Sequence, residues 1–559
     1  MKKNVLSLLG LFVLGLFAQP SALACTSIMV TKGATKDGSN MITYAADSHV
    51  LFGELYFYPA MTYPEGTMLD VIDWDTGKPL GQIPQVAQTY SVVGNMNEHQ
   101  LAITESTFGG RKECQGQNDG IIDYGSLIYI TLQRAKTARE AITIMGELVN
   151  TYGYYSSGES FSISDKNEVW YMELIGKGEG EKGAVWVARR VPNGYVAAHA
   201  NQARIGKFPQ DDKENCLYSA DVIEFAKNKG WYKGKDKDFD FAEVYAPVDF
   251  GGARFCDARV WSIYNRLTDG MDKFTAYAEG KLEKDEATGF TTNKLPLWVK
   301  PSKKLSVQDV MELMRDHYEG TPLDMTQDAG AGAFDLPYRW RGLTWEYEGK
   351  EYFNERAIST QQTGFSLVAQ SRASLPDPIG GILWFGVDDT YSTVYTPMYC
   401  GMTEVPETFE VGNGDMLTYS ETSAFWIFNT VSNFAYLRYS DMIQDIREKQ
   451  KELETKFVDY TAMIDKSASE MFEESPEKAR AFVTDFSVTT ANKMVMDWKK
   501  FGQQLIVKYM DGNVKKQTEK GQFERSEYGQ CPSPNFPGYS EQWKKQVVED
   551  TEDRLEVKE

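Results

Sequence analysis

The sequence predicts an α+β protein built from layers of antiparallel strands and helices. Short β-rich runs separated by turn residues fill much of residues 26–201, and helical patterns form a block within them and dominate residues 431–559. Strands, helices and strands again follow one another without the strict alternation that a parallel βαβ repeat requires. A layered fold is therefore favoured.

The strand predictions begin with residues 26–31 and 40–45, because both are β-rich and Asp37-Gly38 between them is a hairpin signal. The other predicted strands start at Tyr90 (YSVVGNM), Leu101 (LAITEST), Phe161 (FSISDKNEVWYMEL, with a turn at Lys166-Asn167) and Gly183 (GAVWVARRVPNGYVAAHAN, with a turn at Asn193-Gly194).

Helices are predicted from capping signals and apolar periodicity. The segment SLIYITLQRA precedes a capping box, Thr137 to Glu140, that opens a second helix. A later helix should start near Ser306 and stop at Gly320. Two apolar stripes at helical spacing follow: Ile446, Leu453, Phe457, Tyr460 and Ile464, then Met494, Trp498, Phe501 and Leu505.

These stripes indicate helices that pack on a main domain, and a coiled-coil partner site is the alternative. We predict a cleaved signal peptide at 1–24, a main domain expected to be catalytic at 25–430, and a mostly helical region at 431–559. That region should pack on the main domain and end in a charged tail.

The first 24 residues have the pattern of a secretory signal peptide. Lys2 and Lys3 precede an apolar run, and Ala22-Leu23-Ala24 forms an A-x-A cleavage site. The run is shorter than the roughly 20 residues that a membrane-spanning helix needs, and an uncleaved anchor is the alternative. We expect signal peptidase to mature the protein, which is then exported to the periplasm or the exterior without stable membrane insertion.

Composition excludes several other classes of protein. The net charge of −21 argues against a nucleic-acid partner, which would need clustered Lys and Arg. The sequence has no C-x-x-C pair, H-E-x-x-H motif, P-loop or Rossmann fingerprint, so no metal and no cofactor are predicted. Each of the four histidines is better explained as a surface or core residue than as the partner of a nucleophilic cysteine: His49, His99, His199 and His317.

Cys25 would be the first residue after cleavage. A thiolate is the reactive form of cysteine, and a free thiol has a pKa near 8.5, so a base must take the proton. The α-amino group of the same residue, with a pKa of about 7.7–8.0, can do so directly or through one water. A lipid-anchored cysteine and a structural cysteine are the alternatives. Disulfide partners are not assignable among Cys114, Cys216, Cys256, Cys400 and Cys531.

The segment CTSIMVTKGATKDGSNMITYAADSH resembles the opening of the cysteine dipeptidase family of the N-terminal-nucleophile (Ntn) hydrolases. That family starts with Cys-Thr, carries a Thr-x-Asp-Gly-Ser turn and has an Asp after the second strand; here these are Cys25-Thr26, residues 35–39 and Asp47. The similarity continues through NMNEHQLAITEST, AHANQARI and STQQTGFSLVAQ to about Met510. It implies an αββα sandwich, two antiparallel sheets between helical layers, and hydrolysis of dipeptides.

The resemblance also implies roles for particular residues. Cys25 matches the nucleophile, Asp47 the acid that orients its amine, and Asn201 an oxyanion donor, a contact worth about 2.7–4 kcal/mol. The second oxyanion donor is expected to be a backbone N–H near Thr107. Many relatives carry Arg where Tyr44 stands, so Tyr44 is expected to offer a hydrogen bond or an aromatic wall instead.

Three further candidates come from the residues themselves. Glu105 is a candidate for binding the substrate's ammonium group, and a strand-edge carboxylate in water is the alternative. Arg254 or Arg259 is a candidate for neutralising developing charge or holding a carboxylate, and a surface ion pair is the alternative. The sequence does not choose between these two arginines.

The predicted function is an exported cysteine dipeptidase that acts on small peptides through an acyl-enzyme. The first alternative is an Ntn amidase that cuts a non-peptide amide, as penicillin V acylase and bile salt hydrolase do. The second is a non-enzymatic lipoprotein anchored through Cys25. The sequence leaves a homo-oligomer open.

Overall fold

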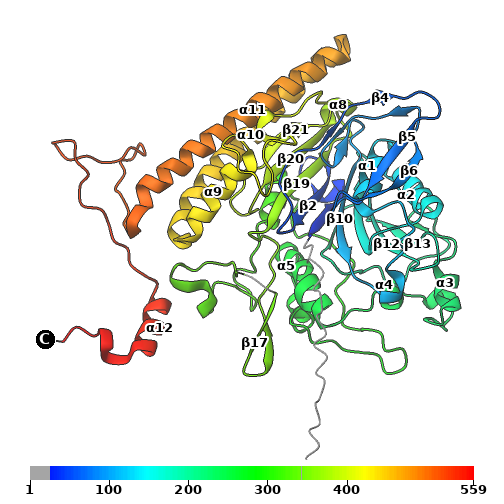
Figure 1. Ribbon diagram of the computed structural model, residues 1–559, viewed down its shortest axis with the longest axis horizontal. Helices are drawn as coiled ribbons and strands as arrows, with labels where there is room; N and C mark the ends of the chain where they lie inside the picture. The colour runs from blue at the N-terminus through cyan, green and yellow to red at the C-terminus, as the bar shows by residue number, and fades with distance from the viewer. Residues whose placement is uncertain (1–24, 341–342, 559) are drawn as a thin grey trace, which may run out of the picture.

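A computed structural model describes residues 25–340 and 343–558, so the predicted signal peptide lies outside the described residues. Two large antiparallel sheets form the body of the molecule (Figure 1). The seven-stranded sheet has the order β16 (Trp298–Val299), β14 (Val196–His199), β1 (Ser27–Val30), β2 (Asn40–Asp47), β19 (Thr363–Ser371), β20 (Gly381–Val387) and β21 (Thr396–Tyr399).

The second sheet has eight strands, and three small two-stranded sheets lie outside the large ones. The eight-stranded order is β15 (Cys216–Tyr218), β13 (Ala184–Arg190), β12 (Val169–Gly176), β11 (Gly158–Ser164), β10 (Ala102–Phe108), β9 (Met96–Asn97), β8 (Val92–Val93) and β3 (Phe57–Tyr58). The small sheets pair β4 (Met61–Thr62) with β7 (Gln88–Thr89), β5 (Met68–Ile72) with β6 (Pro79–Pro84), and β17 (Thr344–Tyr347) with β18 (Lys350–Phe353).

The described helices are α1 (Tyr124–Leu132), α2 (Ala138–Tyr152), α3 (Val222–Asn228), α4 (Phe241–Tyr245), α5 (Ala258–Leu267), α6 (Thr275–Ala278), α7 (Val307–Leu313), α8 (Asp377–Gly380), α9 (Ala424–Tyr436), α10 (Tyr439–Glu474), α11 (Pro476–Tyr509) and α12 (Glu541–Thr551). The sheets contact each other through β1 and β2 on one side and β10 and β11 on the other. Helices α1 and α2 contact the eight-stranded sheet, whereas α5, α7, α9 and α11 contact the seven-stranded one. The predicted α+β class with antiparallel sheets is confirmed.

The predicted β1–β2 hairpin is present, and local side chains shape its turn. The Asp37 carboxylate accepts hydrogen bonds from the backbone N–H and the hydroxyl of Ser39. Gly38 has a φ of +75°, which a residue without Cβ adopts at little cost. The hairpin places Cys25 and Asp47, the ends of its two arms, at the same edge of the sheet because the strands are antiparallel.

The segment with a turn at Asn193-Gly194 does not form one hairpin, because its two strands lie in different sheets. β13 belongs to the eight-stranded sheet and β14 pairs with β1 in the other. The Thr31 hydroxyl accepts hydrogen bonds from the N–H groups of Gly194 and Tyr195, at 2.9 and 3.1 Å, and so ties this crossing to the end of β1.

The helices mostly follow their capping signals. Thr137 caps α2, but the Glu140 carboxylate accepts from the N–H of Lys136, so the predicted capping box is only half formed. Ser306 and Asp309 form a complete capping box at the start of α7. The predicted end of that helix at Gly320 is wrong, because α7 ends at Leu313. The chain leaves the helix there and buries Arg315 in an ion pair with Glu454.

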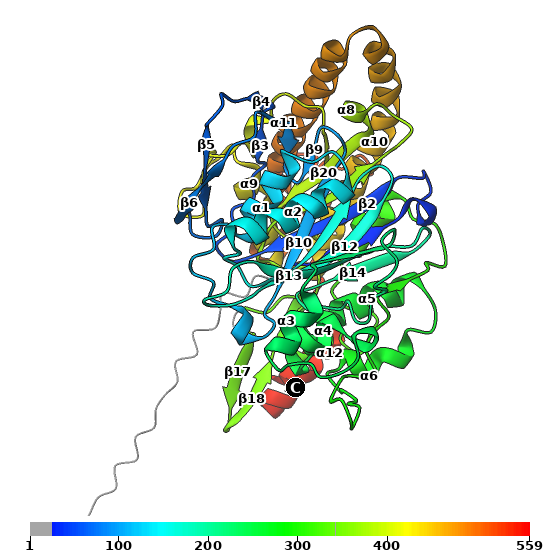
Figure 2. The ribbon, with the colours of Figure 1, turned by 90° about the vertical axis from the view of Figure 1, so that its right-hand side faces the viewer.

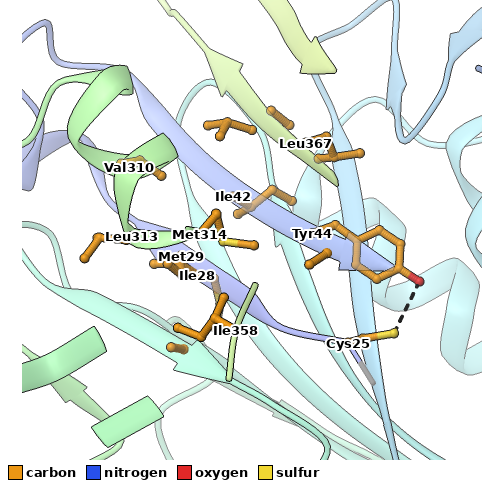
Figure 3. Close-up of a cluster of buried hydrophobic side chains, with 14 of the residues drawn as sticks. Cys25, Ile28, Met29, Ile42, Tyr44, Val310, Leu313, Met314, Ile358 and Leu367 are labelled. Atoms are coloured by element: carbon orange, nitrogen blue, oxygen red, sulfur yellow. Dashed lines mark hydrogen bonds between the residues drawn. The ribbon is translucent and has the colours of Figure 1, made fainter. Parts of the chain in front are cut away.

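Helix α7 covers the strands that lead to the N-terminal cysteine. Figure 3 shows Val310 and Leu313 grouped with Met29 of β1 and Ile42 of β2. Burying aliphatic side chains of this size contributes roughly 1.5–3 kcal/mol each. Tyr44 and Cys25 lie at the far end of the same cluster, so this packing fixes the position of the hairpin's open end.

The C-terminal helices carry the predicted stripes. α10 and α11 pack against each other and project beyond the sheets as a helical hairpin (Figure 2). Most stripe residues are buried or partly buried, whereas Tyr460 is exposed. α12 has no buried residue, as expected of a solvated tail. The domain division at residue 430 stays a prediction. All six cysteines of the described chain are free thiols.

Asp388 gives a prediction for the dependence of stability on pH. It is buried after β20, and its carboxylate accepts hydrogen bonds from Asn429 and Ser432. Burial, with the neighbouring Asp389 charge, raises its pKa to about 7. The folded protein therefore holds a proton that the unfolded chain releases near pH 4, so stability falls as pH rises from about 4 to 7.

We expect Asp388→Asn to remove this loss, because asparagine does not ionise. The unfolding free energy of the variant minus that of the native protein should increase by up to about 4 kcal/mol from about pH 4 to pH 8. Denaturant unfolding of both proteins at these two pH values measures the difference. An equal difference at both pH values would contradict the explanation.

Candidate functional site: a buried N-terminal cysteine

Cys25 lies just before β1 and is held from both sides of its backbone. The residue is buried, with only 3% of its surface exposed. Its backbone nitrogen donates to Asn201 Oδ1 at 3.1 Å, and its carbonyl oxygen accepts from Arg259 Nη1 at 2.9 Å. The position of the thiol is thus fixed by two residues that are far away in the sequence.

Asn201 follows β14 and links Cys25 to the other sheet. Its φ of +63° is in the left-handed region, which asparagine tolerates better than most residues. Its N–H donates to Ser106 Oγ at 3.2 Å, and its side-chain nitrogen donates to the Thr107 carbonyl at 2.7 Å. Thr107 therefore meets Asn201 through its carbonyl oxygen. The predicted N–H donor near it stays a prediction.

His199 helps to hold this arrangement as a buried neutral side chain. Its ring nitrogens lie 2.6 Å from Ser106 Oγ and 2.8 Å from Ser162 Oγ, between the sheets. Burial lowers its pKa to about 3. It is a satisfied core histidine, as the sequence indicated.

Arg259 is the arginine that reaches Cys25. It lies on α5 and is fully buried. Besides the Cys25 carbonyl, its guanidinium donates to Thr26 Oγ1 at 2.8 Å, to the Ala200 carbonyl at 3.1 Å and to Asn201 Oδ1 at 2.8 Å. A planar group with five donors suits this set of acceptors.

Arg254 is placed differently, in a largely buried ion pair with Glu355. Its guanidinium also lies 5.2 Å from the centre of the Phe353 ring. Within the described residues it has no recorded hydrogen bond to Cys25. The alternative of a surface ion pair is wrong for both arginines, because each is buried by more than nine-tenths.

The thiol faces a tyrosine and a carboxylate. Cys25 Sγ lies 3.5 Å from Glu105 Oε1 and 3.9 Å from Tyr44 Oη, and the Tyr44 hydroxyl donates to the same Glu105 oxygen (Figure 3 shows the Cys25–Tyr44 contact). Burial, followed by the charges of Glu105 and Asp47, raises the pKa of the Cys25 thiol. Tyr44 also meets Phe365 edge to face, so it supplies both a hydrogen bond and an aromatic surface.

Asp47 ends β2 with one carboxylate oxygen bound and one free. Oδ1 accepts from the Thr363 hydroxyl at 2.6 Å, whereas buried Oδ2 has no hydrogen-bond partner within the described chain. Burial raises the Asp47 pKa to about 7, although the Thr363 hydrogen bond and the charges of Arg259 and Arg356 oppose the rise.

The sequence interpretation missed three residues of this region: Thr363, Arg356 and Glu159. Thr363 lies in the segment STQQTGFSLVAQ, but nothing marks it within that segment. Arg356 is near enough for the charges of Asp47 and Cys25 to act on it, and burial lowers its pKa to about 10. Glu159 adjoins Glu105 from the next strand. Only the folded register brings these residues together.

Cys25 thus places a buried thiol beside the Glu105 carboxylate in a layered α+β fold, with its backbone held by Asn201 and Arg259. The chain belongs to peptidase family C69: the model described as Peptidase family C69 matches residues 53–452. This confirms the family resemblance and the predicted enzyme class, a hydrolase of the cysteine-peptidase type. The matched stretch includes Glu105, Asn201 and Arg259 and begins after Cys25.

Several relatives are named dipeptidases. A "Probable dipeptidase" of Latilactobacillus sakei is 26% identical over 450 residues, which cover 77% of this chain and 85% of the relative. A "Probable dipeptidase" of Salmonella dublin is 24% identical over 417 residues, 70% of this chain and 84% of that one. A "Probable dipeptidase B" of Streptococcus pyogenes serotype M1 is 22% identical over 520 residues, 90% and 96% of the two chains.

The described part of the chain offers neither a metal-binding cluster nor a membrane-spanning helix. In residues 25–340 and 343–558, no three or more His, Cys, Asp or Glu side chains are grouped so that they could hold a metal ion. Nor does any helix of that part of the chain combine the length and the apolar character needed to cross a membrane.

Proposed function

We propose that this protein is an exported cysteine dipeptidase whose nucleophile is Cys25, set free as the N-terminal residue when residues 1–24 are removed. One observation carries the proposal. Asn201 and Arg259 hydrogen-bond to the backbone nitrogen and the carbonyl oxygen of Cys25. The thiol of Cys25 meanwhile contacts Glu105 and Tyr44. The names of the relatives support dipeptides as the substrate class.

The fold supports the Ntn part of this proposal. Two facing antiparallel sheets, with helices packed against each, match the αββα arrangement expected of an Ntn hydrolase. Cys25 lies just before strand β1 of one sheet and contacts Glu105 of the other. The N-terminal sequence supports export to the periplasm or the exterior.

In the proposed mechanism the freed α-amine of Cys25 is the base. Asn201 Oδ1 accepts one of its hydrogens, and the unpartnered Asp47 Oδ2 is available to orient it. The amine takes the thiol proton as sulfur attacks the peptide carbonyl carbon. Because the buried thiol has a raised pKa, proton transfer should accompany the attack rather than precede it.

The remaining steps release the two products and restore the thiol. The C–N bond of the peptide breaks, and the proton on the Cys25 amine passes to the departing amino group. Water then attacks the thioester, the amine takes a proton from it, and the acid product leaves with the thiol restored. Asn201 Nδ2 carries two hydrogens and donates one to the Thr107 carbonyl, so the other is available to the oxyanion.

A panel of substrates tests the proposed function. The mature enzyme is incubated with several dipeptides, penicillin V and conjugated bile salts, with Cys25→Ser protein as the blank. We expect release of amino acids from dipeptides and little turnover of the other amides. Preferential cleavage of penicillin V or bile salts would make the protein an amidase, and turnover by the blank would rule out Cys25.

A further inference from the structure

We propose that Glu105 and Glu159 together form the subsite for the free α-ammonium group of the substrate, so that the enzyme selects peptides with an unblocked N-terminus. The inference rests on the proposed role of Cys25 as the nucleophile. It adds Glu159 to the site and assigns the residues that recognise the substrate's free α-ammonium group.

The two carboxylates come from adjacent strands and face the same way. Glu105 lies on β10 and Glu159 on β11, where Glu159 pairs with Thr107, two residues beyond Glu105. Directly opposite and next-but-one residues of antiparallel strands share one face of a sheet. Both side chains are buried, with exposures of 1% and 0%.

Within the described residues, these two carboxylates lack the cationic partners that buried charges normally have. Neither oxygen of Glu159 has a hydrogen-bond partner among the described residues, and Glu105 Oε2 has none either. No ion pair to either residue is recorded in the described chain. Burying unpaired carboxylates is costly, because their hydration is lost without replacement. A cationic ligand would supply the missing charge and the missing donors.

The pKa shifts agree with this geometry. Burial and the charge of Glu105 raise the pKa of Glu159, and burial also raises that of Glu105. Two neighbouring carboxyl groups in an apolar site disfavour each other's ionised form. An arriving ammonium group would favour the ionised form of both.

The distance to the thiol identifies which ammonium group fits. Glu105 Oε1 lies 3.5 Å from Cys25 Sγ. In a dipeptide the α-nitrogen and the scissile carbonyl carbon are joined through one Cα and lie roughly 2.5 Å apart. When that carbon touches the sulfur, the ammonium of the same residue is within hydrogen-bond reach of Glu105. The subsite therefore receives the N-terminal residue, and cleavage follows that residue.

The hydrogen bond from Tyr44 makes the two oxygens of Glu105 different. Its hydroxyl donates to Oε1, which also faces the thiol, and this leaves buried Oε2 for a ligand. An N-acylated peptide would bring a neutral amide to this place and leave both carboxylates unpaired. A site whose buried groups pair with a charged group of the substrate discriminates strongly against an analogue that lacks this group.

The test compares alanyl-alanine with N-acetyl-alanyl-alanine. We expect the mature native enzyme to hydrolyse the free dipeptide at least about 100-fold better in kcat/KM. In Glu159→Gln, kcat/KM for the free dipeptide should fall roughly 10- to 100-fold while that for the acetylated one stays or rises. The ratio of the two values is the readout, because structural damage would lower both alike.

Glu173→Gln is the matched control. Glu173 is a buried carboxylate on the neighbouring strand β12, but it accepts hydrogen bonds from the N–H groups of Arg204 and Ile205. Its replacement should leave the ratio unchanged. An unchanged ratio in Glu159→Gln would overturn the proposal.

Two further results keep the inference separate from folding and from the nucleophile. If Glu159→Gln does not fold, the native enzyme alone decides, because equal hydrolysis of both peptides would overturn the subsite. Cys25→Ser tested on the same peptides reports the nucleophile. Loss of hydrolysis in that variant, with equal native rates on both peptides, would leave the proposed function intact and remove only the subsite.

Discussion

Replacing Cys25 by serine is expected to lower kcat for dipeptide hydrolysis by roughly 10⁴-fold or more. Serine keeps the size of the side chain and the backbone contacts to Asn201 and Arg259, and it removes only the sulfur. A hydroxyl is a much weaker nucleophile than a thiol when its only base is an amine of ordinary pKa. Initial rates on a dipeptide, with circular dichroism and thermal unfolding to verify the fold, measure the effect.

The control is Cys400→Ser. Cys400 is also fully buried, and its thiol lies 3.2 Å from the Asp377 carbonyl in a different part of the structure. We expect this variant to keep kcat within a few-fold of the native value, with a modest change in stability. If Cys25→Ser keeps a tenth or more of the native rate, Cys25 is not the nucleophile.

The second large effect is expected at Arg259. Its guanidinium contacts four oxygen atoms around the nucleophile, including the Cys25 carbonyl and Asn201 Oδ1. A lysine ammonium cannot reach these acceptors in the same fork, and the acceptors it leaves are buried. Arg259→Lys should lower kcat roughly 100- to 1000-fold and the unfolding free energy by about 2–5 kcal/mol.

Arg315→Lys separates the two consequences. Arg315 is equally buried and pairs with Glu454 and Glu312, away from the recorded contacts of Cys25. It should lose a similar amount of stability and keep most of its kcat. If Arg259→Lys is destabilised but retains native kcat, then Arg259 supports the fold and does not position the nucleophile.

The local parts of this structure could be predicted from the sequence. The β1–β2 hairpin follows from two β-rich runs and the Asp37-Gly38 turn, and the start of α7 follows from the Ser306–Asp309 capping box. The end of α7 could not, because the chain leaves the helix after Leu313 and Arg315 then forms a buried ion pair with Glu454, 139 residues later in the sequence. Local propensity does not contain such a tertiary contact.

Some residues of the candidate site could also be predicted from the sequence, and others could not. Cys25 and Asp47 were recognisable because the motif that contains them is short and continuous. Arg259 could not be chosen over Arg254, because the choice depends on how α5 docks against Cys25, 234 residues earlier in the chain. Glu159 was missed because strand register, not sequence, places it beside Glu105.

The crossing at Asn193-Gly194 illustrates the remaining difficulty. The turn signal is genuine, since Gly194 has a φ of +90°. A turn residue states that the chain bends and not which sheet receives the next strand. Here β14 joins β1 in the other sheet, and that pairing brings Asn201 to Cys25.

In the proposed mechanism, removal of residues 1–24 creates the catalyst, because the α-amine of Cys25 is its base. The most direct measurement uses a precursor in which a specific protease site ends immediately before Cys25. Intact mass and dipeptide hydrolysis are followed together during cleavage. We expect an inactive, folded precursor and activity that rises in proportion to the fraction of chains that begin at Cys25. Full activity before cleavage, or an active mature protein whose Cys25 amine carries a lipid, would contradict it.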